Sequence, residues 1–255
     1  MIRTMRCRRV ARPSLDRNQI KYIAVIAMLI DHVAVFFLAP GIAEASTARI
    51  ALYAAMRVIG RLTGPIMIFF LVEGFIHTSS RRKYGARLFV FGLLSQIPYV
   101  LSHYNKLFAA DFNVIITLFI LFLMLTAVEK INNGFLNRAV VLALIAVTYW
   151  CDWGVIGPLM AWVFYQYHED RKMQIQYYAA VCMIQLVSAA TVLSMKGLHW
   201  YGELWQAGLF LVIPFLIWYN GRPGSRSAFS RWIFYIVYPL HLLIIWLITA
   251  SGVHL

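Results

Sequence analysis

The chain has 255 residues, of which 62% are apolar and only 13% charged, and its mean hydropathy is +0.71. A soluble domain of this length is nearer half apolar and a quarter charged, so the composition excludes a soluble globular enzyme, a disordered protein and a disulfide scaffold. Apolar runs of roughly 15–20 residues recur from Tyr22 to the C-terminus. This pattern predicts an all-α fold, a polytopic transmembrane helical bundle that leaves no stretch for a soluble domain.

Nine membrane spans are predicted, with the N-terminus inside and the C-terminus outside. They run over residues 21–39, 52–77, 87–101, 112–128, 136–150, 154–167, 175–195, 203–219 and 231–250. The fifth and sixth are short, because a helix of about 14 residues covers about 21 Å against roughly 30 Å of hydrocarbon. The alternative is seven spans and a re-entrant hairpin around residues 151–154. Residues 1–20 are a basic cytoplasmic tail, and 21–255 form one integral-membrane domain.

The net charge of +13 is concentrated in alternate loops. Eighteen of the 23 Lys and Arg residues fall into five clusters: seven up to Lys21, then 81–87, 130–138, 171–172 and 222–231. The other loops carry only Arg49, Lys106 and Lys196. This is the positive-inside pattern, so the basic charge sets orientation in the bilayer and implies no nucleic-acid partner.

A cleaved signal peptide is the competing interpretation of the N-terminus, because Ala43-Glu44-Ala45 is similar to a signal-peptidase site. The apolar stretch before it is longer than a usual signal sequence and contains Asp31 and His32, which favours a retained first span.

Three cysteines are spread over the predicted topology. Cys7 is expected in the cytoplasm, Cys151 on the outer face and Cys182 within a helix, so no structural disulfide is predicted.

Ionisable residues inside membrane helices are costly, so each is a candidate functional residue. The candidates are Asp31, His32, Arg57, Arg61, Glu73 and His241, with Gln96 and Asn113 as uncharged polar groups. The plain alternative is that they hold helices together through hydrogen bonds.

Lys21 and His32 are eleven residues apart, which places both on one helix face with a rise of about 16.5 Å between them. A cation at the cytoplasmic edge and an imidazole near the middle of the membrane suit a long ligand with an anionic head and a reactive tail. Acyl-coenzyme A is such a ligand, with phosphates at one end and a thioester at the other.

Depth counting along other helices supports one polar layer. His241 lies about 15 Å and Gln96 about 13.5 Å from the same edge, close to the depth of His32. Arg61 is expected somewhat further outward, and Pro65 is expected to kink its helix between Arg61 and Glu73.

Asp31 points about 100° away from its neighbour His32, so it cannot orient that imidazole. It is expected to pair with Arg57 or Arg61 on the next helix, and a purely structural ion pair is the alternative.

The order and spacing of these residues resemble the TraX family of membrane acetyltransferases over about residues 15 to 247. The matching segments are Asp16, Lys21-Tyr22-Ile23-Ala24, Met28-Leu29-Ile30-Asp31-His32, Arg57-Val58-Ile59-Gly60-Arg61, Pro65, Leu71-Val72-Glu73-Gly74-Phe75-Ile76-His77-Thr78, Tyr84, Arg87-Leu88, Ser95-Gln96-Ile97-Pro98, Asn113, Thr117-Leu118 and Phe234-Tyr235-Ile236-Val237-Tyr238-Pro239-Leu240-His241-Leu242. The family also looks related to the acyltransferase-three and heparan N-acetyltransferase group, in which a basic residue precedes a His by eleven positions, as Lys21 precedes His32.

The resemblance implies a multi-pass enzyme of the bacterial inner membrane. It would take acetyl from cytoplasmic acetyl-CoA, without a metal, and pass it to an envelope acceptor, either a pilin N-terminus or a polysaccharide.

Each candidate residue has an expected role in such a transfer. His32 is the expected base or acyl carrier, assisted by His241, with Asp31 alongside. Arg61 and Gln96 are expected at the oxyanion or the acceptor, and Lys21, Glu73, Arg81 and Arg82, with Lys83, at coenzyme A.

Two other functions use similar residues. A proton-coupled transporter also needs membrane Asp, Glu, His and Arg, although no paired broken helices of an inverted repeat are evident. The third interpretation is a non-catalytic assembly factor of an envelope complex.

Overall fold

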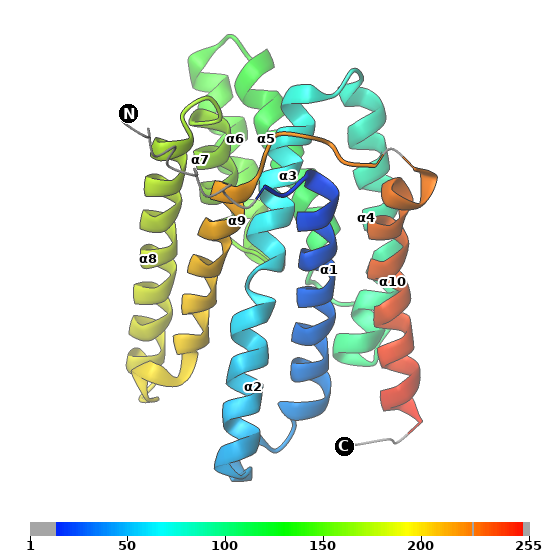
Figure 1. The fold of residues 1–255 in the computed structure, drawn as a ribbon, viewed down its shortest axis with the longest axis vertical. Coiled ribbons are helices and arrows are strands. Elements are labelled where there is room, and N and C mark those ends of the chain that lie inside the picture. The colour runs from blue at the N-terminus through cyan, green and yellow to red at the C-terminus, as the bar shows by residue number, and fades with distance from the viewer. Residues whose placement is uncertain (1–13, 226, 252–255) are drawn as a thin grey trace, which may run out of the picture.

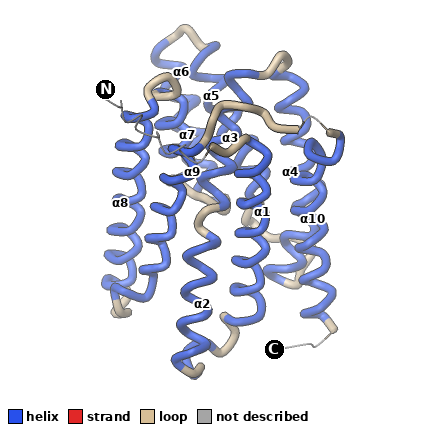
Figure 2. The backbone as a smooth tube through the Cα atoms, in the orientation of Figure 1, coloured by secondary structure: helices blue, strands red, loops and turns tan. Residues whose placement is uncertain are grey.

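A computed structural model of the protein describes residues 14–225 and 227–251, with only the backbone for residues 228–231. Cys7 and most of the basic tail lie outside the described residues. Long helices run alternately up and down in one bundle (Figure 1), and short loops connect most of them (Figure 2). Within the described part of the chain there are no strands, only two isolated bridges. The predicted all-α fold is confirmed.

Nine apolar helical segments follow one another in the predicted order. They are α1 (Arg17–Val33) with the π-helical turn η1 (Ala34–Leu38), α2 (Thr47–Gly60) with α3 (Thr63–His77), α4 (Arg81–Tyr104), α5 (Val114–Lys130), α6 (Gly134–Val147) with η3 (Thr148–Trp150), α7 (Ile156–Gln166), α8 (Arg171–Met195), the 3-10 helix η4 (Trp200–Leu211) with α9 (Val212–Trp218), and α10 (Ala228–Ala250). A short 3-10 turn, η2 (Ile42–Glu44), connects the first two segments.

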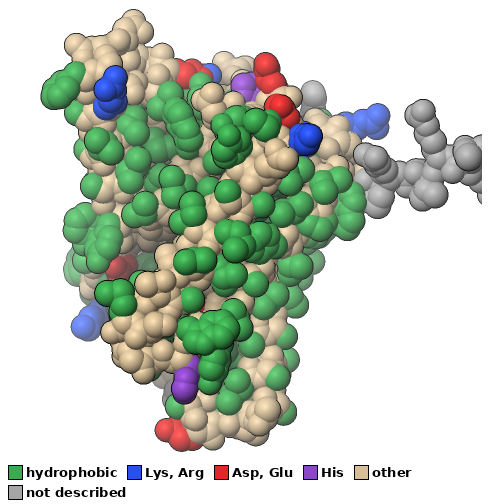
Figure 3. Space-filling model, turned by 90° about the vertical axis from the view of Figure 1, so that its left-hand side faces the viewer, with side chains coloured by type: hydrophobic (Ala, Val, Ile, Leu, Met, Phe, Trp, Pro, Cys, Tyr) green, Lys and Arg blue, Asp and Glu red, His purple; other side chains and the backbone are tan. Residues whose placement is uncertain are grey.

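Six of these segments are long and apolar enough to cross a membrane, namely Arg17–Leu38, Thr47–His77, Arg81–Tyr104, Arg171–Met195, Trp200–Trp218 and Trp232–Ala250. Large apolar side chains are exposed along them, including Leu94 at 59% and Ile184 at 56%. Figure 3 shows one such face, where hydrophobic side chains cover the middle and most charged groups lie toward the two ends. The chain is a membrane protein.

The members of the predicted basic clusters that the structure describes gather at one end of the bundle, called here the basic end. It is the end at which α1, α4, α6, α8 and α10 begin, and α10 finishes at the opposite end (Figure 1). The loop between α9 and α10 crosses the basic end and holds the start of α1. Leu15 N–H donates to the Trp218 carbonyl at 2.8 Å, and the Asn18 side chain donates to the Ser225 carbonyl at 2.6 Å.

The helices α6 and α7 are short, and the turn between them, residues 151–155, starts at a buried residue, while Asp152 and Val155 are exposed. Cys151 is only 9% exposed and forms an isolated bridge with Phe112. Cys151, which the sequence placed on the outer face, is thus buried against the segment that precedes α5. Helices of 14 and 11 residues reach only about 21 and 16 Å, which fits the re-entrant alternative. Cys151 and Cys182 are both buried and free.

The second segment, α2 with α3, is interrupted just before Pro65. Pro65 has no N–H to donate to the carbonyl of Arg61, four residues earlier, so the helix cannot continue through that point. The structure ends α2 at Gly60, caps it with Arg61 and starts α3 at Thr63. The expected kink is present just before Pro65, at Arg61 and Leu62.

Candidate functional site

Three cavities lie in a row along α1 and share lining residues. The first, at the basic end, measures about 300 Å³ and is called the basic mouth. The second, a narrow passage of about 80 Å³, shares Lys21, Phe70, Tyr84 and Tyr235 with the mouth. The third, called the polar chamber, measures about 270 Å³ and shares Met28, Thr63, Val114 and Tyr238 with the passage. Three neighbouring cavities therefore follow one another from Lys21 to His32.

The basic mouth gathers cations from helices far apart in the sequence. Arg17 and Lys21 project from α1 and Arg87 from α4, and all three line the cavity. Aromatic rings hold them in place. The Lys21 Nζ lies 5.0 Å from the centre of the Phe234 ring and 5.7 Å from that of Phe70. The mouth suits a ligand that carries several negative charges.

The passage is apolar over most of its lining, which includes Ala24, Val25, Leu71, Leu88 and Leu118. α1 supplies one wall, because Ala24 and Met28 follow Lys21 at roughly helical spacing on the same face. Such a passage suits the extended, weakly polar arm of a ligand whose charged head stays in the mouth.

His32 lines the polar chamber, and the predicted packing of His241 against it is observed beside the chamber. Their ring centres are 4.7 Å apart and the rings are nearly perpendicular. A third imidazole, His103 at the end of α4, lies 6.4 Å from His32 and also lines the chamber. The sequence analysis missed His103, although it lies seven residues beyond Gln96, on nearly the same face of α4.

The tautomer of these imidazoles follows from their hydrogen bonds. His32 Nδ1 lies 2.8 Å from the Met28 carbonyl oxygen, and His241 Nδ1 lies 2.8 Å from that of Val237. A carbonyl oxygen only accepts, so each Nδ1 carries the proton and donates it. Each Nε2 of the neutral ring then holds a lone pair, and that of His241 is buried without a partner. An imidazole held in this way is prepared to accept a proton at Nε2.

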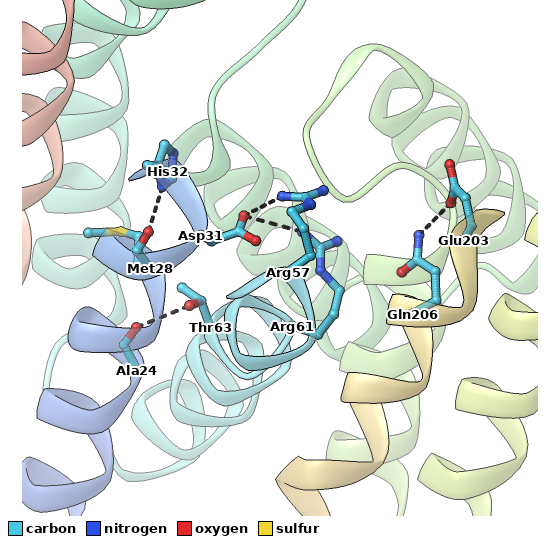
Figure 4. Close-up of polar contacts among 9 residues, drawn as sticks. All are labelled: Ala24, Met28, Asp31, His32, Arg57, Arg61, Thr63, Glu203 and Gln206. Atoms are coloured by element: carbon cyan, nitrogen blue, oxygen red, sulfur yellow. Dashed lines mark hydrogen bonds and ion pairs between the residues drawn. The ribbon is translucent and has the colours of Figure 1, made fainter. Parts of the chain in front are cut away.

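Asp31 forms the predicted ion pair on the side of α1 that faces α2 (Figure 4). Its Oδ2 lies 2.7 Å from Arg57 Nη1 and 3.4 Å from Arg61 Nη2. The Trp205 ring stacks on both guanidinium groups, with ring-centre distances of 4.2 and 4.7 Å. Both arginines line the chamber. Asp31 therefore fixes two cations at the chamber wall and does not contact His32.

The turn between α6 and α7 supplies Asp152 and Trp153 to the chamber. Trp153 packs so closely on α3 that a Cβ at Gly64 would lie 2.0 Å from its indole ring. The Trp153 ring also lies 5.3 Å from the Arg61 guanidinium. Asp152 was not predicted as a site residue, because the predicted topology placed it in a loop outside the membrane.

Four residues predicted for the site lie elsewhere. Gln96 accepts from the Asn113 side chain at 2.8 Å and donates to the Asp111 carbonyl at 2.7 Å, so it fastens α4 to the start of α5. Glu73 accepts from Tyr219 at 3.3 Å, beside the mouth. Arg81 pairs with Glu129, and Arg82 is exposed. Arg17 and Arg87 line the mouth instead. Arg17 could have been predicted from helical spacing, since it lies four residues before Lys21 on α1.

Comparison with known proteins agrees with this layout. The profile of the family described as TraX protein matches residues 16–249. The chain is 33% identical over 234 residues to a protein of Dichelobacter nodosus called probable fimbrial assembly protein FimC, serogroup H1. The match covers 88% of this chain and 91% of that protein. No solved structure matches. The family match spans the mouth, the passage and the chamber, and this chain belongs to the TraX family.

Proposed function

We propose that this protein is a transmembrane acetyltransferase that takes acetyl from acetyl-CoA at the basic end and transfers it to an acceptor that reaches the polar chamber. The observation that carries the proposal is the row of three cavities along α1, with cations at one end and the His32 imidazole, held by its Nδ1, at the other.

Acetyl-CoA would fit the three cavities in one orientation, with its phosphates in the mouth and its thioester toward the chamber. Its phosphates match Arg17, Lys21 and Arg87 in the mouth, and its arm matches the apolar passage. The rise from Lys21 to His32 is about 16.5 Å, so a ligand anchored at the mouth needs an arm of that order to bring its thioester to the chamber. The positive-inside orientation would open the mouth to the cytoplasm, where acetyl-CoA is available.

The chemistry requires a base and a leaving group. The acceptor nitrogen or oxygen attacks the thioester carbon, and His32 Nε2 takes the proton that the acceptor loses. The carbon–sulfur bond then breaks, and the same proton passes to the departing thiolate to give free coenzyme A. His241 packs edge-on against the His32 ring and would limit its movement. An acyl-His32 intermediate is the alternative route, in which the imidazole attacks the thioester first.

The acceptor is proposed to come from the opposite end. His103 lines the chamber and is also exposed at the end of α4. The Dichelobacter nodosus relative is named for fimbrial assembly, which supports a role in pilus assembly in the inner membrane and an envelope acceptor such as a pilin N-terminus or a polysaccharide.

Acetyl-CoA is expected to stabilise the detergent-purified protein against heat. A ligand that binds only the folded state at about 100 times its Kd adds about 2.7 kcal/mol, enough to raise the melting temperature by several degrees. S-acetylpantetheine lacks the nucleotide phosphates and should need a much higher concentration. A proton-coupled transporter or a non-catalytic assembly factor should respond to neither compound, and that result would contradict the proposal.

Lys21→Ala is expected to weaken acetyl-CoA binding by about 10–100-fold, since a hydrogen bond to a charged group contributes about 1.5–3 kcal/mol. The loss should be larger at low salt, where the charge pair is less screened. Turnover at saturation should change little, because a phosphate contact is made in the ground and transition states alike. Lys172→Ala is the matched control, an exposed lysine at the same end of the bundle. Equal binding by both variants would remove Lys21 from the donor site.

A further inference from the structure

The junction between the passage and the polar chamber has two polar groups whose hydrogen-bonding capacity is not used. Four residues line both spaces, Met28, Thr63, Val114 and Tyr238. The Met28 carbonyl accepts from His32, and the Thr63 hydroxyl donates to the Ala24 carbonyl at 3.0 Å. The Tyr238 hydroxyl and the backbone N–H of Val114 remain.

Tyr238 is buried at 4% exposure, and its hydroxyl has no hydrogen-bond acceptor among the residues that the structure describes. The hydroxyl and the backbone N–H of Val114 belong to residues that line the same two cavities. The phenolic oxygen forms no hydrogen bond within the described part of the chain, so the proton of the hydroxyl lacks an acceptor there. Leaving a buried donor unsatisfied lowers stability, and the location of this donor at the junction suggests that a ligand supplies the missing acceptor.

Val114 is the first residue of α5, so its N–H has no acceptor within the helix. The Asn113 side chain caps the next two N–H groups, those of Ile115 at 2.9 Å and Ile116 at 3.2 Å. The N–H of Thr117 donates to the Asn113 carbonyl. Val114 is therefore the uncapped donor of the first turn, at the positive end of the α5 dipole.

We propose that the Tyr238 hydroxyl and the Val114 N–H form the oxyanion site of the acetyl transfer. This inference rests on the proposed function. When the acceptor attacks the thioester carbon, the carbonyl π-electron pair moves to oxygen, and these two donors bind the resulting oxyanion. The pair returns as the carbon–sulfur bond breaks, so neither donor loses its proton.

The surrounding rings put the base and the donors next to one another. The Tyr238 ring centre is 5.6 Å from that of His241, which is 4.7 Å from that of His32. A thioester at the end of the passage would thus lie beside the hydroxyl and the N–H, which line the junction. His32 would lie just beyond them, where the chamber begins. The assignment replaces Gln96, which the sequence placed at the oxyanion and whose amide is occupied by Asp111 and Asn113.

Tyr238→Phe tests the assignment by removing the hydroxyl alone. Membrane vesicles with the full-length protein are given radiolabelled acetyl-CoA, and thiol release and label on envelope material are measured. Turnover at saturation should fall by about 10²–10³-fold, as for loss of one oxyanion donor. The KM for acetyl-CoA, and the binding of a thioether analogue that lacks a transferable acetyl group, should stay unchanged. The melting temperature should not fall, since the hydroxyl removed has no acceptor.

Tyr178→Phe is the matched control. Tyr178 is equally buried, lies outside the three cavities, and its hydroxyl donates to the Leu209 carbonyl at 2.8 Å. This variant should melt at a lower temperature and keep its turnover, the reverse of Tyr238→Phe.

The outcomes separate the two proposals. An active wild type with an equally active Tyr238→Phe variant overturns the oxyanion assignment alone. A Tyr238→Phe variant that loses stability and analogue binding together marks Tyr238 as structural and also overturns it. A wild type that releases no thiol and transfers no label overturns the proposed function, and the assignment with it.

Discussion

Replacing His32 by alanine is expected to lower acetyl transfer by about 10²–10⁴-fold, the usual loss for a missing general base, while coenzyme A binding stays largely intact. The reason is the distance between the two ends of the ligand site. His32 lies in the polar chamber, and the cations that would hold the phosphates lie eleven or more residues away along α1 or on α4. A coenzyme A binding curve measured beside turnover at saturation checks both halves of this prediction.

His168→Ala is the matched control, because His168 is exposed between α7 and α8. It should leave binding and turnover unchanged. If an acyl-His32 intermediate is obligatory, the loss in His32→Ala should exceed that for a general base. A variant that loses binding and keeps turnover at saturation would reverse the roles of Lys21 and His32. If neither Lys21→Ala nor His32→Ala alters the handling of acetyl-CoA, the transporter becomes the leading interpretation.

Much of the fold could be predicted because two features of a membrane protein's sequence, its apolar runs and its basic loops, determine its topology. Long apolar runs gave the helices, and the basic clusters gave the end at which each begins, so α1 and α10 were expected to run in the same direction. The hairpin of α6 and α7 was less determined. Its helices are as apolar as membrane spans but too short to cross the hydrocarbon layer. The position of the turn between them follows only from its packing against Phe112 and Gly64.

The site could be predicted only from the depth of each side chain along its own helix. Counting residues gives the depth of a side chain along its own helix but not which neighbour it faces. The depth of His241 led to the right neighbour, because its helix packs beside α1. Gln96 has a similar depth, but its side chain hydrogen-bonds Asn113 at the start of α5 and so lies away from His32. Asp152 and Tyr238 enter the site through tertiary packing that no spacing in the sequence encodes.

Asp31→Asn is expected to destabilise the fold strongly. The carboxylate of Asp31 lies between Arg57 and Arg61, and its side chain is 13% exposed while theirs are 12% and 16% exposed. Asparagine keeps the shape and removes the charge, so two buried guanidinium groups lose their closest counter-charge. Removing one partner of a buried ion pair costs about 3–5 kcal/mol. Thermal unfolding in detergent and the yield of folded protein measure this loss. Glu169→Gln, which neutralises a carboxylate that is 90% exposed, is the control and should have almost no effect.

The double variant Asp31→Asn with Arg57→Gln separates charge balance from shape. Asp31→Asn alone leaves both Arg57 and Arg61 without their carboxylate, and Arg57→Gln alone leaves Asp31 paired with Arg61, whereas the double variant leaves only Arg61 without a carboxylate partner. If the ion pair stabilises the junction of α1 and α2 through charge balance, the double variant should be less destabilised than the sum of the single ones, with a coupling of about 0.5–3 kcal/mol. Additive losses would mean that each side chain acts through its own packing, Arg57 through the stack with Trp205 at 4.2 Å and Asp31 through its contact with Gly60. Turnover of the double variant then tells whether Arg61, still present at the chamber wall, needs Asp31 to hold its position. A refolded but inactive double variant would place Asp31 among the positioning residues, and a fully active one would make the pair purely structural.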